Sequence, residues 1–246
     1  GYSLRGGIRA AEWRLWGACS YKWAYLPSHI MAVIPCPMGH TCRPRRAHFA
    51  TIHRLEDSIV PYNISFISLG CAKNQVNCEQ MMASVQAAGH TIQVQPEGAD
   101  VVVVNTCGFL QSACEEAIDN ILEMAELKRA GQVQKILVTG CMTQRYKQDV
   151  LNELPEVDGI LGTGSYGDIC AAIDEVMGAS GLRPCHLGSI HTAPQDGGRI
   201  LSTPPWYAYL RIAEGCDDHC AYCVIPSLRG KYRSRPMEGL LEEARE

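Results

Sequence analysis

Residues 101–107 have the sequence VVVVNTC, a run of four β-branched side chains followed by two polar residues and a cysteine. A continuous valine run is typical of a parallel strand that is buried on both faces of its sheet. Such strands occur in α/β proteins, in which helices cover both faces. The stretch therefore predicts an α/β fold whose central strand ends next to a cysteine.

Short apolar runs alternate with segments of helical spacing on both sides of this stretch. Gly89 and Gly131 end two of these segments, and glycine is common just beyond the last turn of a helix. Strands are expected at 64–69, 101–104, 136–139 and 158–161, and helices at 74–88, 111–130, 143–153 and 166–177. This alternation predicts an open parallel sheet in one domain over residues 62–178.

Three cysteines occupy the same position relative to successive strands. Cys71, Cys107 and Cys141 each follow a predicted strand, with separations of 36 and 34 residues, and each has a glycine beside it. Ligands of open α/β sheets bind at this carboxyl edge. The alternative is three unrelated buried cysteines, since free cysteine is commonly buried. The shared position favours three thiolate ligands of an iron–sulfur cluster that has one open iron.

A second group of cysteines lies on one loop, with the spacing C-x3-C-x2-C at Cys216, Cys220 and Cys223. Three thiolates can hold three corners of a cubane cluster and leave the fourth iron open to a small molecule. A zinc knuckle is the alternative, but structural zinc needs four protein ligands. His219 would have to fold back to be the fourth, so the spacing favours a cluster.

The remaining segments carry weaker signals. Residues 179–205 are rich in Gly, Pro, Ser and Thr and are interpreted as a linker. Residues 206–246 are expected to contain a strand at 207–212, the cysteine loop and a helix that begins near Pro236, which together form the start of a second domain. The basic stretch 225–235 is either a solvated loop or a place where arginines hold a carboxylate or phosphate.

Residues 1–60 have no helical or strand period and are interpreted as a leader without domain character, either disordered or translated from an upstream start. Cys36, His40 and Cys42 in this leader form only a weak metal motif. Cys78, Cys114 and Cys170 fall in predicted helices and Cys185 in the linker, so all four are interpreted as structural.

Composition limits the class of protein. The chain has 246 residues, 46% of them hydrophobic, and a net charge of −4, which excludes a disordered chain and shows no bulk attraction to nucleic acid. Its 13 cysteines are an odd number in an α/β chain without a convincing signal peptide or spanning segment. We therefore expect a cytoplasmic protein that uses cysteine for metal ligation, with no membrane contact.

Over residues 63–246 the chain resembles the radical S-adenosylmethionine (SAM) methylthiotransferases. The segments that carry the resemblance are SLGCAKNQVNCE at 68–79, NTCGF at 105–109, TGCM at 139–142 and LRIAEGCDDHCAYCVIPSLRGKYRSRP at 210–236. The resemblance implies a flavodoxin-like methylthiotransferase domain followed by the truncated start of a radical SAM (β/α) partial barrel. Asn77-Cys78 departs from the family, which usually has Asp and then a small hydroxyl residue there.

The resemblance also implies two 4Fe-4S clusters, one on Cys71, Cys107 and Cys141 and one on Cys216, Cys220 and Cys223. The second would cleave SAM to a 5′-deoxyadenosyl radical, and the first would carry the sulfur that is transferred. Tyr222 stands where the superfamily often has an aromatic residue near the adenine. An unidentified electron donor and an unidentified sulfur donor are implied as partners. This chain is expected to be inactive alone.

Two branches of the family differ in substrate. SLGCAKN, NTCGF and IPSLRG resemble the branch that modifies the β-carbon of an aspartate in protein twelve of the small ribosomal subunit. The alternative is the branch that modifies isopentenyl-adenosine in tRNA. Alternatives of other classes are an iron–sulfur electron-transfer or scaffold protein, which would need four cysteines for each cluster, and a zinc-binding interaction module. The oligomeric state is not predicted.

Overall fold

The computed structural model describes residues 60–178, 181, 183–192 and 197–246. The predicted leader, except Val60, lies outside the described residues together with its Cys-His-Cys motif. The main feature is a six-stranded, wholly parallel sheet in the order β2-β1-β3-β4-β5-β6. Its strands are β1 (Asn63–Ser68), β2 (Thr91–Gln93), β3 (Val101–Thr106), β4 (Lys135–Gly140), β5 (Gly159–Leu161) and β6 (Cys185–His186). The α/β parallel-sheet prediction is confirmed.

The valine run forms β3, a central strand in which every residue is buried. Val102 and Val104 pack into the core on one face of the sheet, while Val101 and Val103 pack into the core on the other. A strand that is covered on both faces has no solvent-facing positions for polar residues. Apolar residues therefore follow one another without alternation, which accounts for the run of four valines.

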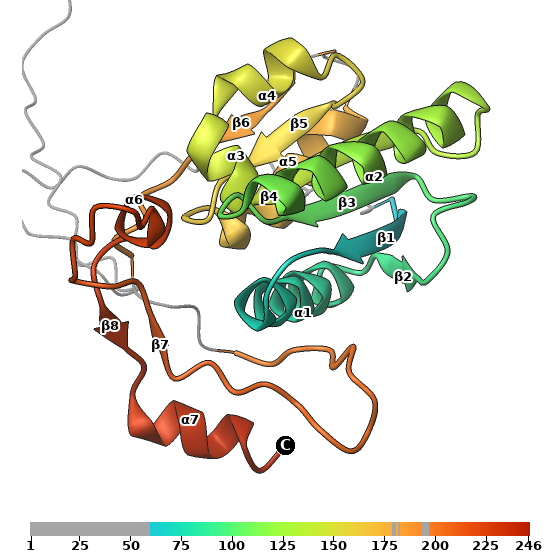
Figure 1. Cartoon of the computed structure of the whole chain (residues 1–246). Coiled ribbons are helices and arrows are strands. Elements are labelled where there is room, and N and C mark those ends of the chain that lie inside the picture. The colour runs from blue at the N-terminus through green and yellow to red at the C-terminus, as the bar shows by residue number, and fades with distance from the viewer. Residues whose placement is uncertain (1–59, 179–180, 182, 193–196) are drawn as a thin grey trace, which may run out of the picture. The chain divides into compact units, whose positions relative to one another are not determined.

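Helices cover both faces of the sheet (Figure 1). The helix α1 (Ala72–Ala87) and the helix α5 (Ile169–Met177) share one core. The helices α2 (Gln111–Arg129), α3 (Cys141–Tyr146) and α4 (Gln148–Glu153) lie on the opposite face, where α2 and α4 supply most of the buried helical side chains. The chain changes face between β1 and β3, which makes the gap between these two strands the topological switch point of the sheet.

The structure differs from the sequence expectation in four places of the sheet domain. A single helix expected at 143–153 is two short helices, because Lys147 has a φ of 50° and interrupts the helical backbone. The helix expected at 166–177 begins with the 3-10 turn η1 (Tyr166–Asp168). The edge strands β2 and β6, of three and two residues, were not predicted, and β6 lies inside the predicted linker.

The C-terminal segment, residues 197–246, contains little regular structure. The strand expected at 207–212 is wrong: those residues form no sheet pairing, and most are exposed. The paired residues are instead β7 (Ala213–Glu214) and β8 (Arg233–Ser234), which are antiparallel, and two short helices follow the cysteines: α6 (Ile225–Arg229) and α7 (Met237–Glu243). The helix expected near Pro236 is confirmed as α7.

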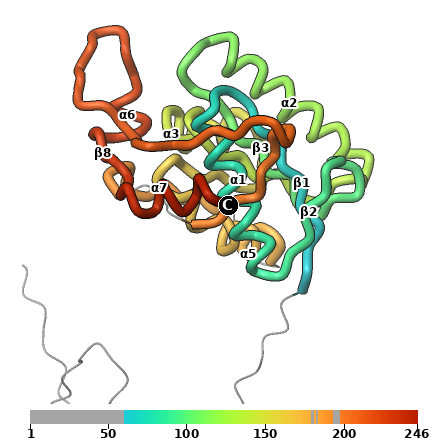
Figure 2. The backbone as a smooth tube through the Cα atoms, turned by 90° about the horizontal axis from the view of Figure 1, so that it is seen from below, coloured from blue at the N-terminus to red at the C-terminus, as the bar shows by residue number. Residues whose placement is uncertain are grey.

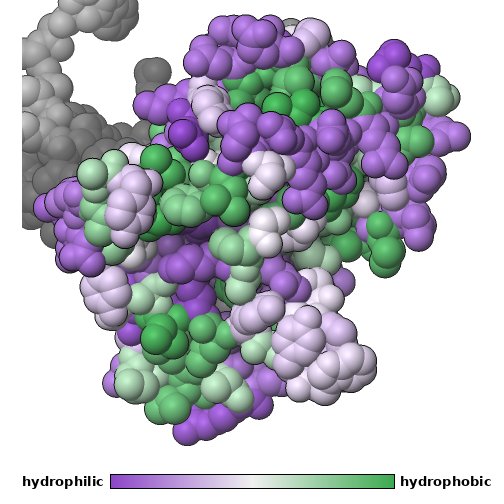
Figure 3. Space-filling view, viewed as in Figure 1, coloured by the Kyte–Doolittle hydropathy of each residue, from purple (hydrophilic) through white to green (hydrophobic). Residues whose placement is uncertain are grey.

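Figure 2 shows the loop between β7 and α6 projecting away from the sheet domain. Hydrophobic residues gather on the surface around α7 (Figure 3), where Met237 and Leu241 are exposed. Within the described residues, no helix is both long enough and apolar enough to span a bilayer.

Gly140, immediately before Cys141, offers a test of the sheet edge. Its φ is 107°, and a Cβ there would lie 2.4 Å from the Thr106 carbonyl oxygen. We expect Gly140→Ala to lower the free energy of unfolding by about 3 kcal/mol or more, because strain and a backbone clash add. Urea denaturation followed by circular dichroism measures the change.

Gly131→Ala is the matched control. Gly131 also has a positive φ, of 73°, but open space surrounds the position of a Cβ. The left-handed backbone alone should cost about 1 kcal/mol. Equal losses in the two variants would show that close packing at the sheet edge has no energetic weight.

Candidate functional site

The sheet brings Cys71, Cys107 and Cys141 to one edge. Cys71 caps the N-terminus of α1 just after β1, Cys107 follows β3, and Cys141 is the first residue of α3 directly after β4. Since β1, β3 and β4 are parallel neighbours, their carboxyl ends lie side by side. The first two of these cysteines flank the switch point, where open α/β sheets bind their ligands.

Two glycines pack directly against these cysteines. A Cβ on Gly70 would lie 2.7 Å from the Cβ of Cys107, and one on Gly108 would lie 2.6 Å from the carbonyl carbon of Cys141. Neither position has room for a side chain. The glycines therefore allow the three cysteine-bearing loops to approach each other closely.

The buried amide of Asn74 ties these loops together. Its Nδ2 donates to the carbonyl oxygens of Leu69 and Thr106, both at 3.0 Å, which precede two of the cysteines. Its Oδ1 accepts from the Sγ of Cys141 at 3.7 Å. A single side chain thus contacts the backbone or side chain of all three loops.

Arg229 provides a positive charge at the same place. Its Nη2 lies 2.5 Å from the Asn74 Oδ1 and 3.3 Å from the Cys141 Sγ. Burial raises the pKa of the Cys141 thiol, the charge and hydrogen bond of Arg229 oppose this, and the charges of Cys107 and Cys71 add to the rise. The other two thiols of the sheet edge therefore act electrostatically on Cys141.

Glu214 is the carboxylate that balances Arg229. Its Oε2 lies 3.1 Å from the Arg229 Nη1 and 3.5 Å from the Arg211 Nη1, while its Oε1 lies 3.2 Å from the Lys73 Nζ. Burial acts to raise the pKa of Glu214, but Arg229, Lys73 and Arg211 outweigh it and lower that pKa. Burial also acts to lower the pKa of Arg229, but coupling to the ionised forms of Tyr166, Cys141 and Glu214 raises it overall.

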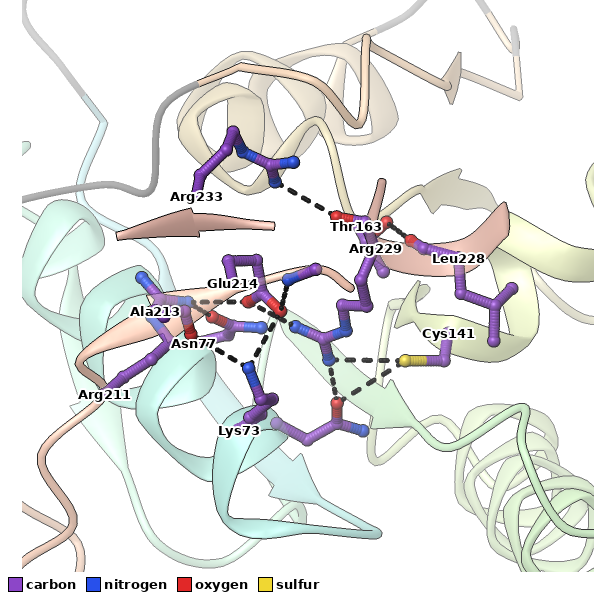
Figure 4. Close-up of polar contacts among 12 residues, drawn as sticks. Lys73, Asn77, Cys141, Thr163, Arg211, Ala213, Glu214, Leu228, Arg229 and Arg233 are labelled. Atoms are coloured by element: carbon purple, nitrogen blue, oxygen red, sulfur yellow. Dashed lines mark hydrogen bonds and ion pairs between the residues drawn. The ribbon is translucent and has the colours of Figure 1, made fainter. Parts of the chain in front are cut away.

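This ion-pair network joins the two cysteine groups (Figure 4). Lys73 is two residues after Cys71 and also donates to the carbonyl of Ala213 at 2.9 Å. Glu214 is two residues before Cys216. We call Lys73, Glu214 and Arg229, with Asn74, the linking network.

The second cysteine group lies on the loop that β7 and β8 close at its base. The Cys216 amide donates to the Gly230 carbonyl at 3.1 Å, and the Tyr232 amide donates to the Asp217 carboxylate at 3.0 Å. Gly215 has a φ of 78°, and a Cβ there would lie 2.1 Å from the Lys231 carbonyl oxygen. The start of the loop is therefore held in place by the segment that follows it.

Beyond this base the loop is open to solvent. Cys220 is exposed, and Cys216 and Cys223 are partly buried. Tyr222 is 87% exposed, so its ring has no packing partner that fixes it. His219 is also exposed.

In the described part of the chain, no three His, Cys, Asp or Glu side chains converge closely enough to hold a single metal ion. A cubane cluster makes a different demand, because each thiolate binds a different iron. At the sheet edge the donor set is three thiols from three loops beside a buried guanidinium, which suits an anionic thiolate cluster. This donor set fits a 4Fe-4S group.

The linking network was not predicted from the sequence. Asn74 belongs to the SLGCAKN segment, and Arg229 belongs to the basic stretch 225–235, but nothing in the sequence paired them. Of the four cysteines that the sequence analysis interprets as structural, Cys78 and Cys114 are buried in α1 and α2 and Cys170 lies in α5, whereas Cys185 is exposed in β6.

Residues 63–162 match the family model described as "Uncharacterized protein family UPF0004". Two curated relatives define the class more narrowly, and both are named ribosomal protein uS12 methylthiotransferase RimO. The relative from Syntrophomonas wolfei is 50% identical over 183 residues, which are 74% of this chain and 41% of that protein. The relative from Clostridioides difficile is 45% identical over 183 residues, with the same coverage.

The part of this chain that aligns, 74% of its length, is similar to these methylthiotransferases. That part is about two fifths of the length of these curated relatives. A solved structure of the radical S-adenosylmethionine methyltransferase TsrM from Kitasatospora setae superposes with a TM-score of 0.52 at 12% identity, covering 75% of this chain and 45% of that one. At this identity the match concerns the fold alone.

Substitution of Arg229 tests the linking network. We expect Arg229→Met to lower the free energy of unfolding by about 3–5 kcal/mol, because it leaves the buried Glu214 carboxylate with weaker compensation. Urea denaturation of the metal-free protein gives this value.

Arg129→Met is the matched control, because Arg129 pairs with Glu126 at 2.7 Å where both side chains are more than 60% exposed. An exposed pair of this kind contributes at most about 1 kcal/mol. A loss for Arg229→Met that is no larger than the control's would show that the network does not stabilise the domain.

The exposures of the thiols predict an order of chemical modification. Among the described cysteines, iodoacetamide should modify Cys71 and Cys220 first, because both are exposed. Cys185 is also exposed, but partial burial of its sulfur raises the pKa of its thiol, so it should follow. Cys141 and Cys78 should react last: both are buried, and burial raises the pKa of Cys78 to about 12. Peptide mass spectrometry over a time course measures the order in the reduced, metal-free protein.

Unfolding the protein in urea serves as the control, since all thiols should then react at similar rates. Rapid labelling of Cys141 in native conditions would contradict its buried position between Asn74 and Arg229.

Proposed function

We propose that this chain carries the cluster-binding part of a radical SAM methylthiotransferase that acts on an aspartate of ribosomal protein uS12. The observation that carries the proposal is the pair of cysteine triads joined by one buried ion-pair network. One triad lies at the switch point of the sheet and the other on the C-x3-C-x2-C loop. The names of the relatives support the assignment of class and substrate.

Each triad is proposed to hold one 4Fe-4S cluster: Cys71, Cys107 and Cys141 the first, and Cys216, Cys220 and Cys223 the second. When bound, two such clusters supply one-electron cleavage of SAM and a site from which sulfur is transferred. Three thiolates for each cluster leave one iron open in both. An electron-transfer or scaffold protein would instead need four protein ligands for each cluster.

The residues around the first triad have defined tasks in this proposal. Arg229 places positive charge 3.3 Å from the Cys141 sulfur and so favours the thiolate form that ligation needs. Asn74 sets the spacing of the three loops. Partners that fix metal ligands in this way commonly raise metal affinity 10- to 100-fold.

The loop of the second triad is open to solvent. This openness suits a loop that must admit a small molecule such as SAM. Cys220 and Tyr222 face solvent, and we propose that Tyr222 packs against the adenine of SAM. The substrate aspartate, an electron donor and a sulfur donor are further proposed partners, and the cytoplasm is the proposed location. Both curated relatives described above carry the name of the ribosomal-protein branch, and neither carries that of the tRNA branch.

Anaerobic reconstitution with iron and sulfide tests the two-cluster proposal. We expect about eight irons for the unaltered chain and about four after either triad is changed to Ala. Iron and acid-labile sulfide are counted, and the visible absorption of the clusters is recorded. A variant with Cys170→Ala and Cys185→Ala is the matched control and should retain about eight irons.

About four irons, lost only when Cys216, Cys220 and Cys223 are changed, would contradict the methylthiotransferase assignment and indicate a radical SAM protein with one cluster. Bound zinc without visible absorption would overturn both cluster assignments.

A further inference from the structure

A cavity of about 250 Å³ lies beside the linking network, and no cysteine lines it. Its walls come from four parts of the chain that meet at the carboxyl edge of the sheet: the loop and turn after β5, the polar face of α1, the segment after β6, and the arginine-rich C-terminal segment. The residues that matter below are Asn77, Tyr166, Arg211, Glu214, Arg229 and Arg233.

Three buried hydrogen-bond donors around this cavity have no acceptor among the described residues. They are the hydroxyl of Tyr166, the Nδ2 of Asn77 and the Nε of Arg233. Tyr166 is 8% exposed and Asn77 is 1% exposed. The Tyr166 hydroxyl and the Asn77 amide are neighbours, but neither completes a hydrogen bond of ordinary geometry.

The orientation of Asn77 is set by its other partner. Its Oδ1 accepts a hydrogen bond from Arg211, which leaves the amide nitrogen as the free end. Buried donors without acceptors are rare in folded proteins, and each costs free energy unless a ligand or water fills the space. All three atoms named above are donors, so the missing group is an acceptor.

The charge of the lining points to an anionic acceptor. Arg233 contacts carbonyl oxygens of Lys231 and Arg229 but, within the described residues, has no carboxylate at ion-pair distance. Glu214 is already held by Arg229 and Lys73. Asp168, the other carboxylate of the lining, is 54% exposed at its side chain and lies 3.9 Å from His186, so no carboxylate of the described residues is within ion-pair distance of Arg233.

The backbone adds to this preference. Gly164, Tyr166 and Gly167 line the cavity at the point where η1 leads into the nine-residue helix α5. The N-terminal end of a helix carries a partial positive charge and favours anions. The guanidinium of Arg233, the unfilled donors of Tyr166 and Asn77 and a helix N-terminus thus surround one space.

We propose that this cavity binds a small oxyanion, a carboxylate or a phosphate group, through Tyr166, Asn77 and Arg233. Of the two alternatives for the basic stretch 225–235, the proposal favours anion binding over a solvated loop. The proposal does not depend on the iron–sulfur clusters, because none of the proposed cluster ligands lines the cavity.

Isothermal titration calorimetry of the whole chain tests the proposal. The probes are inorganic phosphate and acetate, titrated at ionic strength held constant with chloride. Saturable binding of either probe with one site per chain is expected, and the tighter of the two identifies the class of anion. No saturable heat from either probe would overturn the proposal.

Three variants locate the binding. Tyr166→Phe removes one hydroxyl and should weaken binding about 10-fold or more, since a hydrogen bond to a charged group is lost. Asn77→Asp places a carboxylate where the anion would sit and should abolish binding, while the new carboxylate can pair with Arg211 and keep the fold. Tyr62→Phe, at the amino end of β1, should bind like the unaltered chain.

Thermal unfolding separates binding from folding. If the hydroxyl of Tyr166 serves only the structure, Tyr166→Phe changes the unfolding temperature but not the affinity. Unchanged affinity in both Tyr166→Phe and Asn77→Asp would place the anion elsewhere and overturn the proposal. Loss of binding in these two with retention in Tyr62→Phe supports it.

Discussion

The side chain of Asn74 uses its full hydrogen-bonding capacity at the point where three loops and the C-terminal segment meet. Its two N–H bonds hold the carbonyls of Leu69 and Thr106, and its oxygen accepts from Arg229 and Cys141. An amide with these four partners is fully buried at little cost, whereas any missing partner would be expensive. Asn74 therefore sets the spacing of the cysteines and is one of the contacts, with Lys73–Glu214, that dock the C-terminal segment.

Much of the sheet could be predicted from the sequence because its central strands are long and uniformly apolar. The valines of β3 occupy two opposite cores, and only a parallel strand covered on both faces explains them. The edge strands β2 and β6 have two or three residues, too few for a period to show. The division of the expected helix at Lys147 could not be predicted for another reason. No pattern in the sequence indicates that a lysine adopts a positive φ.

The cysteine positions of the site were also predictable, because both triads have local spacing or a repeated place after a strand. Their electrostatic partners were not. Arg229 and Asn74 are 155 residues apart, and Lys73 and Glu214 are 141 apart. Which charge compensates which is decided when the chain folds, and a run of basic residues in the sequence says nothing about it. The same holds for the free donors of Tyr166 and Asn77.

The polar face of α1 has a consequence for the order in which the chain folds. Glu79 is 1% exposed, and its carboxylate is held by Ser202 and Arg199, which follow it by 123 and 120 residues. A ribosome adding 5–20 residues per second needs about 6–24 s to supply them. During that interval this carboxylate keeps its hydration shell. Removal of water from this polar face of α1 therefore waits until the C-terminal segment has been synthesised, whereas the apolar face with Met81 and Val85 can pack on the sheet earlier.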